Sequence, residues 1–218
     1  MALTFPLSTT QFMDLLPIKE MTFELSEAME TDETGGGEIL TADLGARLWQ
    51  GEIVLGDMTP DEADTALALI DLLRRAGGSF MVHDRARPWP RSDWKGAALA
   101  TFSPTIYALN AAPRELRIAG LPVGYVLRPR DALAFSYGSN PTRFALHRLV
   151  GSVTANASGI VPQTEVVPNI RPGATVGAAV QLIKPACKAV IVPGSYQPGR
   201  RKARLTTGAS FRWQQTLR

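Results

Sequence analysis

Only one segment of this chain carries the full signature of an α-helix, and this restricts the fold more than any other feature. Thr59-Pro60-Asp61-Glu62 combines an N-cap threonine, a proline at the first helical position and a glutamate at the third, which is the capping-box pattern. Apolar residues then recur on one helical face, at Ala66, Leu69, Ile70 and Leu73. Gly77-Gly78 ends the pattern. The sequence therefore predicts one amphipathic helix over about residues 60–76.

Segments on both sides of this helix alternate apolar and polar residues, which is the period of a half-buried strand. Residues 21–26 and 47–55 both alternate in this way, and residues 79–83 form a further short strand-like run. Residues 31–37 contain no apolar side chain, so we expect a polar hairpin loop joining two or three antiparallel strands. The core of this N-terminal region is expected to contain Phe23, Trp49, Leu69, Leu73 and Phe80.

The second half of the chain consists of short strand-like runs separated by turn residues. The candidate strands are residues 105–109, 115–119, 132–137, 143–153, 175–183, 186–192 and 209–216. Residues 85–96 are rich in proline and tryptophan, which excludes regular structure there and indicates a boundary near residue 100. We predict a mainly β fold of the β-rich α+β class. Residues 1–100 would form an antiparallel β-sandwich-like domain with the helix, and residues 101–218 a second all-β sandwich or barrel.

Charge is distributed very unevenly along the chain, although the formal net charge is only +3. Residues 1–84 contain 16 Asp and Glu against 4 Lys and Arg, a net charge of −12. Residues 85–218 contain 4 Asp and Glu against 19 Lys and Arg, a net charge of +15. Such asymmetry indicates two surfaces with different partners, or one surface that meets the other in a neighbouring copy.

The residues that commonly carry catalysis or bind metals are few and scattered. With one cysteine, Cys187, and two histidines, His83 and His147, there is no disulfide framework and no recognisable metal-ligand spacing. The Gly35–Gly37 run lacks the Lys-Ser/Thr of a phosphate-binding loop, and no G-x-S-x-G elbow occurs. We therefore expect no catalytic, metal-binding or cofactor-binding residues and no enzymatic activity. No secretory signal or stretch of about 18 apolar residues is visible, so no membrane partner is expected.

A basic cluster near the C-terminus is the strongest candidate for a contact surface. It consists of Arg200, Arg201, Lys202 and Arg204. Basic clusters can bind phosphate backbones, but no nucleic-acid-binding module is recognisable, and the acidic first half would repel DNA. We therefore expect these residues to make interface or outer contacts with protein rather than to bind a specific nucleic acid.

Two groups of motifs are similar to the distal tail, or baseplate, proteins of long-tailed bacteriophages. Residues 49–63, continuing through Leu69–Leu73, Gly77–Phe80 and Asp84, resemble the N-terminal part of these tail-tip proteins. Residues 127–133, 147–150, 155–159 and 167–171 resemble a run that recurs in the same family, with Arg130 where glycine is usual. Phe211-Arg212-Trp213 resembles the final strand. The resemblance covers about residues 20–215, and its motifs are loose and structural.

The resemblance implies a structural virion protein of a siphophage-like tail tip or a phage-derived particle. Its N-terminal domain would close into a hexameric ring joining the tail tube to the hub, and its second β domain, galectin-like or OB-like, would point outward. The implied partners are other copies of the chain, the tail tube protein and the hub or baseplate proteins. The protein would be assembled in the cytoplasm of the bacterial host and located in the virion tail tip, without a cofactor. Segregated charge suits such a ring, because head-to-tail contacts require two different complementary faces.

Two other functions remain open. The second domain could be a carbohydrate-binding module for host attachment, presenting an exposed aromatic to a sugar ring. Trp213 and Tyr137 are the candidates, although we expect each to be buried in a strand core instead. A tail hydrolase would need a pair of carboxylates. Residues 85–218 contain only four acids, which makes such a pair in the second domain unexpected: Asp93, Glu115, Asp131 and Glu165.

Overall fold

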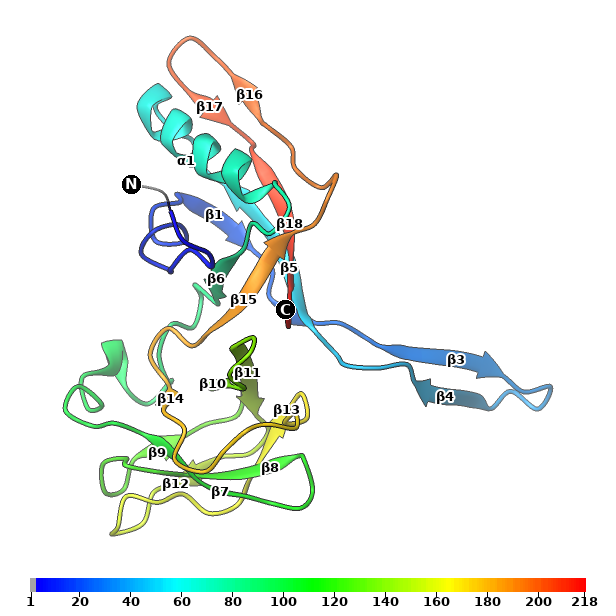
Figure 1. Ribbon diagram of the computed structural model, residues 1–218, viewed down its shortest axis with the longest axis vertical. Coiled ribbons are helices and arrows are strands. Elements are labelled where there is room, and N and C mark those ends of the chain that lie inside the picture. The colour runs from blue at the N-terminus through cyan, green and yellow to red at the C-terminus, as the bar shows by residue number, and fades with distance from the viewer. Residues whose placement is uncertain (1–2) are drawn as a thin grey trace.

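The computed structural model describes residues 3–218 and shows a chain that is mainly β, with 37% of residues in strands and one α-helix (Figure 1). This confirms the predicted β-rich fold class. Two β lobes lie one above the other, and a long β-hairpin projects away from both. We call them the helix lobe, which carries α1, the barrel lobe and the arm, which comprises residues 27–44.

The helix lobe is built on one antiparallel sheet that contains strands from both ends of the chain. Its order is β1 (Ile18–Met21), β5 (Trp49–Leu55), β18 (Ser210–Gln215), β15 (Ala186–Ile191) and β6 (Phe80–His83), and β2 (Glu24–Leu25) also pairs with β5. The prediction that residues 186–192 and 209–216 belong to the second domain is therefore wrong. These segments form strands as expected, but they pair with β5 and β6, so the barrel lobe is inserted between β6 and β15. Local alternation predicts a strand and does not specify its partner.

The helix α1 (Pro60–Leu73) confirms the capping box and ends three residues before the expected position. The Thr59 side chain accepts a hydrogen bond from the Glu62 backbone N–H, and the Glu62 carboxylate accepts one from the Thr59 backbone N–H. The buried face of the helix consists of Ala63, Ala66, Ile70 and Leu73. This face belongs to the same apolar core as the sheet.

Aromatic residues dominate the core of the helix lobe. Of the five residues expected there, Trp49, Leu73 and Phe80 are buried, and Phe23 and Leu69 are half-buried and packed against the core. The Phe23 ring centroid lies 4.7 Å from that of Trp213 and 5.5 Å from that of Trp49. The N-terminal segment also contributes core residues that no periodic pattern indicated, namely Leu7, Phe12, Met13 and Leu16.

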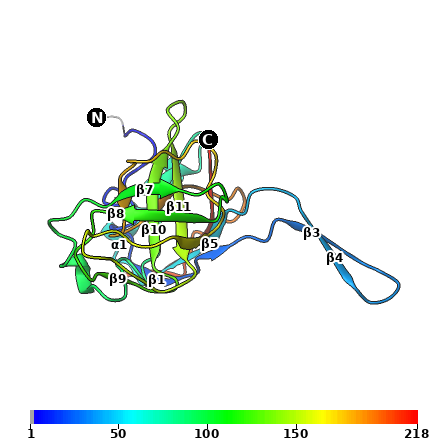
Figure 2. The same cartoon turned by 90° about the horizontal axis from the view of Figure 1, so that it is seen from below.

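The barrel lobe is a six-stranded antiparallel sheet curled into a nearly closed barrel (Figure 2). Its order is β14 (Val180–Gln181), β10 (Ala132–Tyr137), β11 (Arg143–Leu149), β13 (Thr164–Val167), β8 (Glu115–Ala119) and β7 (Thr105–Leu109). A bridge from Thr105 to Ala179 brings the two edges together, and β9 (Val126–Leu127) pairs with β12 (Val153–Thr154) beside the barrel. The strands expected at 105–109, 115–119 and 132–137 are confirmed.

One turn of the barrel lobe places a non-glycine residue in an unusual backbone conformation. Arg130 has a φ of 70°, in the left-handed region that favours glycine. Its backbone N–H donates to the Leu149 carbonyl at 2.8 Å, and the Asp131 N–H donates to the Arg128 carbonyl at 3.0 Å. A hydrogen bond to the neighbouring strand and one within the turn therefore hold an arginine in this conformation.

The two lobes share side chains at their junction. The Trp49 indole N–H donates to the Leu146 carbonyl of β11 at 2.7 Å, and the Gln215 amide donates to the Phe144 carbonyl at 3.2 Å. The Arg148 guanidinium lies 4.6 Å from the Trp49 ring centroid and forms a 3.1 Å ion pair with Asp84. The lobes are therefore joined by hydrogen bonds and an ion pair in partly or fully buried positions.

We expect Trp49→Phe to lower the free energy of unfolding by about 1–3 kcal/mol, because the buried Leu146 carbonyl loses its donor. Urea unfolding measures this loss. Trp94→Phe, at an exposed tryptophan, is the matched control and should change stability by less than about 0.5 kcal/mol. Equal stability of Trp49→Phe and the natural protein would contradict the assigned role of this hydrogen bond.

Candidate interaction surfaces

The two histidines and the single cysteine, which are the residues most often reactive in proteins, are buried in the interior. Among residues 3–218, no group of three or more His, Cys, Asp and Glu side chains is placed to hold a metal ion. Burial lowers the pKa of His83 and raises the pKa of the Cys187 thiol. The His147 ring donates from Nδ1 to the Pro168 carbonyl at 2.7 Å and stacks on Phe135, and burial lowers its pKa to about 4.

The four acidic residues within residues 85–218 have different surroundings. Asp93 and Asp131 are buried and accept hydrogen bonds from backbone N–H groups, so they organise loops. Glu115 and Glu165 lie opposite each other in the β8–β13 register, and Glu115 accepts a 2.7 Å hydrogen bond from the Asn110 amide. The structure thus brings together two of the four carboxylates that were considered for a hydrolase.

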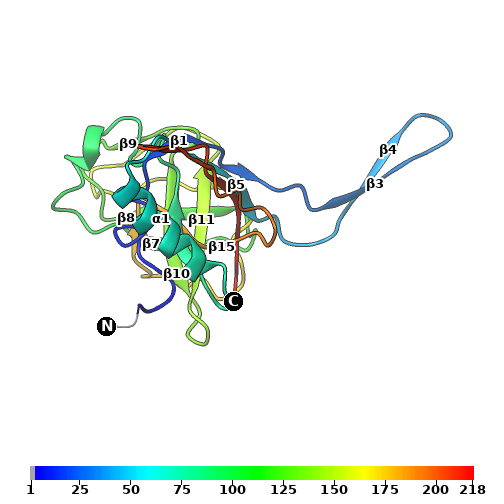
Figure 3. The same ribbon diagram turned by 90° about the horizontal axis from the view of Figure 1, so that it is seen from above.

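The arm is the most unusual surface of the molecule. It consists of β3 (Met29–Glu33) and β4 (Ile39–Asp43), and all ten strand residues are exposed. Three views show it extending away from both lobes (Figures 1, 2 and 3). The expectation of a polar loop over residues 31–37 is partly wrong, because residues 31–33 extend β3 and the turn begins at Thr34. Alternation did not indicate these strands, since neither faces a core.

The arm combines negative charge with exposed apolar side chains. Residues 27–44 contain six carboxylates and no lysine or arginine, a net charge of −6. Leu40 is 56% exposed and Leu44 is 68% exposed. A two-stranded ribbon without further packing is marginally stable in water, and both of its edges are free to pair. The arm therefore has the composition and geometry of a surface that a partner completes.

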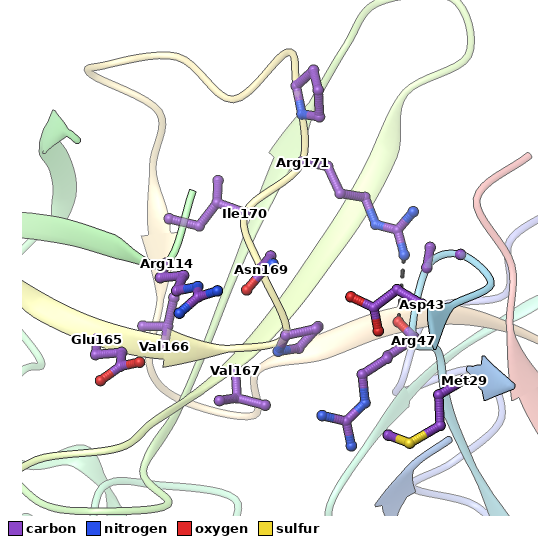
Figure 4. Close-up of a pocket in the computed structure, with 14 residues that line it drawn as sticks. Met29, Asp43, Arg47, Arg114, Glu165, Val166, Val167, Asn169, Ile170 and Arg171 are labelled. Carbon is purple, nitrogen blue, oxygen red and sulfur yellow. Dashed lines mark hydrogen bonds between the residues drawn. The ribbon is translucent and has the colours of Figure 1, made fainter. Parts of the chain in front are cut away.

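A hollow of about 460 Å³ lies where the arm leaves the body (Figure 4). Met29 and Asp43 line it from the arm, and Arg114 and Glu165 line it from the barrel lobe. The Arg171 guanidinium crosses the gap and donates to the Arg47 carbonyl at 3.4 Å. The root of the arm is thus held against the barrel lobe, while its outer part is free.

The predicted basic cluster forms a second exposed hairpin, the basic hairpin. Its strands β16 (Arg200–Arg201) and β17 (Thr206–Thr207) lie beside α1 (Figure 1). The four cationic side chains are all exposed, so the structure gathers the predicted contact residues Arg200, Arg201, Lys202 and Arg204 on one protrusion. Arg201 pairs with Asp64 of α1, whereas within residues 3–218 the other three have no salt bridge.

A third exposed surface surrounds Trp94, in the short 3-10 helix η1 (Trp94–Gly96). Its indole is 72% exposed and lies 5.0 Å from the half-buried Trp89 ring, nearly at a right angle. Asp93 accepts hydrogen bonds from the Ala98 N–H at 3.0 Å and from the Tyr125 hydroxyl at 3.1 Å. Burial raises the pKa of Tyr125, so its hydroxyl remains a donor. A firmly held loop therefore displays an aromatic ring to solvent.

The two aromatic candidates for a sugar contact are not available for this role. Trp213 is 1% exposed and Tyr137 is 5% exposed, which confirms the expected burial of both. Trp213 faces the core because its strand alternates, with Arg212 turned outward. Sequence reasoning did not single out Trp94 as an exposed residue. The only signal for it was the tryptophan-rich stretch at residues 85–96.

Comparison of the chain with protein-family models gave no match, and comparison with curated proteins gave none either. Over residues 3–218, no helix has both the length and the apolar character required to cross a bilayer.

Buried His147 predicts a pH-dependent stability. The folded state keeps the ring neutral down to a pKa of about 4, whereas the unfolded chain binds a proton near 6.5, so unfolding takes up a proton between these values. The free energy of unfolding should therefore fall as the pH drops from 6.5 towards 4, by at most about 3 kcal/mol from this group. Urea unfolding at several pH values measures it. His147→Phe should show a shallower decline; an unchanged decline would contradict the assignment.

Proposed function

We propose that this protein is a structural subunit of a phage tail tip, a distal tail protein that associates with copies of itself into a ring between the tail tube and the hub. The observation that carries the proposal is the arm. It exposes a free ribbon with leucines and six carboxylates, and it makes no contribution to either apolar core. An exposed surface of this kind is expected at an assembly contact.

Two further features support self-association into a ring. The chain carries two protruding hairpins of opposite charge, and a head-to-tail contact needs two different surfaces that complement each other. The tail-protein motifs at residues 49–84 and 211–213 fall in the helix lobe, and those at 127–171 fall in the barrel lobe. In this proposal the helix lobe forms a hexameric ring, the barrel lobe points outward, and the tube and hub proteins are partners in the virion.

Native mass spectrometry tests this function. We expect the full chain to form hexamers, and we expect a variant in which residues 28–44 are replaced by Asn-Gly to be monomeric. The shortened variant should still fold and unfold cooperatively as a monomer, because the removed residues are absent from both cores. A full chain that stays monomeric at every concentration would contradict the proposal, as would a shortened chain that still forms the hexamer.

A second candidate function is carbohydrate binding at Trp94, favoured by the exposed indole on its firmly held loop. A flat apolar ring with a polar edge suits contact with the faces of sugars. Trp94→Ala should then abolish binding on a glycan array, while Val123→Ala, at another exposed apolar residue of the barrel lobe, should retain it. Absence of binding by the natural protein would exclude this candidate.

A further inference from the structure

We propose that the arm of one copy docks on the basic hairpin of a second copy. Its Leu40–Leu44 face covers Leu205, and its carboxylates pair with Arg200, Lys202 and Arg204. This contact rests on the self-association proposed above, and it specifies the two surfaces that meet.

The strand register shows how the residues of the arm divide between its two faces. Residues that lie directly opposite each other share a face, so Leu40 opposite Asp32 and Ala42 opposite Glu30 belong to one face. Leu44, which is hydrogen-bonded to Ala28, continues this row. The result is a line of apolar side chains on β4 with two carboxylates beside it on β3. We call it the leucine face.

The opposite face of the arm is directed towards its own body at the root. Met29 and Asp43 lie opposite each other on that face, and both line the hollow against the barrel lobe (Figure 4). The leucine face therefore points away from the barrel lobe of its own chain. Its leucines are more than half exposed, so a partner that covers them removes apolar surface from water.

The basic hairpin has the complementary composition. Leu205 is 40% exposed and lies among four cationic side chains. Arg201 is engaged by Asp64, which leaves the other three cations for an external partner. An apolar residue within a positive rim matches an apolar row beside carboxylates, and such charge matching favours one register over others.

The positive side chains at the hollow match the arm less well. The arginines around the hollow, Arg47, Arg114 and Arg171, share it with Asp43 and Glu165, so their charge is partly balanced. The two hairpins of one chain point in different directions, with the basic hairpin beside α1 and the arm extending away from it (Figure 1). The contact must therefore join two copies. Because it uses different surfaces on each copy, it repeats around a ring or along a fibre.

Disulfide cross-linking between mixed variants tests this pairing. The natural chain has a single cysteine, Cys187, which is fully buried, so introduced cysteines report on the contact. A mixture of Leu40→Cys chains and Leu205→Cys chains should give covalent dimers under mild oxidation, because a disulfide needs the two Cβ atoms within about 4.5 Å. Neither variant alone should give them to the same extent. The matched control replaces Leu205→Cys with Val123→Cys, which is exposed elsewhere, and should remain uncoupled.

Charge reversal is a second, independent test of the pairing. Glu30→Lys with Asp32→Lys should weaken association by about tenfold or more, and so should Arg200→Glu with Lys202→Glu and Arg204→Glu. Mixing the two reversed chains should restore a heterologous contact, as measured by sedimentation. Arg114→Glu, at the hollow, is the control and should have little effect. Equal weakening by Arg114→Glu would overturn the pairing.

The outcomes separate this contact from the proposed function. One outcome would overturn the pairing and leave self-association intact. In this outcome hexamers form in native mass spectrometry, but the cysteine variants at Leu40 and Leu205 give no cross-link and mixing the charge-reversed chains does not restore association. A natural chain that is monomeric under all conditions would overturn both. Cross-linking together with restoration supports the pairing.

Discussion

The arrangement of the two lobes depends on the contacts that the Trp49 indole makes. It is buried in the helix lobe, donates a hydrogen bond to the backbone of the barrel lobe and lies beneath the Arg148 guanidinium. Arg148 in turn is paired with Asp84 at the end of β6. Trp49 is also the first residue of β5, directly after the segment that ends the arm. Trp49 therefore contacts both lobes and lies close in sequence to the root of the arm.

Contacts with the body hold both projecting hairpins at their bases. The arm is held at its root by contacts around Arg47 and Arg171, while the basic hairpin is attached to α1 through Arg201 and Asp64. Both hairpins are otherwise exposed and carry opposite charge. Two projections of opposite charge on one subunit suit a repeating assembly, because a head-to-tail contact uses two different surfaces of each copy. The proposed tail-tip ring is one such assembly.

Local sequence patterns predicted the elements better than their partners. The capping box at Thr59 and the alternation at residues 105–109 and 132–137 are local, and the corresponding helix and strands are present. The pairing of β18 with β5 joins residues about 160 positions apart, and no local pattern encodes it. The arm was read in part as a loop because a ribbon without a core face has no alternation to detect. The exposure of Trp94 had no local signal, because exposure depends on the tertiary position of a residue and not on its type.

Electron microscopy of the purified full chain tests the central claim most directly, namely that the arm joins copies into a ring. The account predicts closed six-fold rings in which each arm lies across the boundary to the next subunit and reaches its basic hairpin. Particles of single-subunit size would contradict it, and so would rings in which every arm extends freely into solvent.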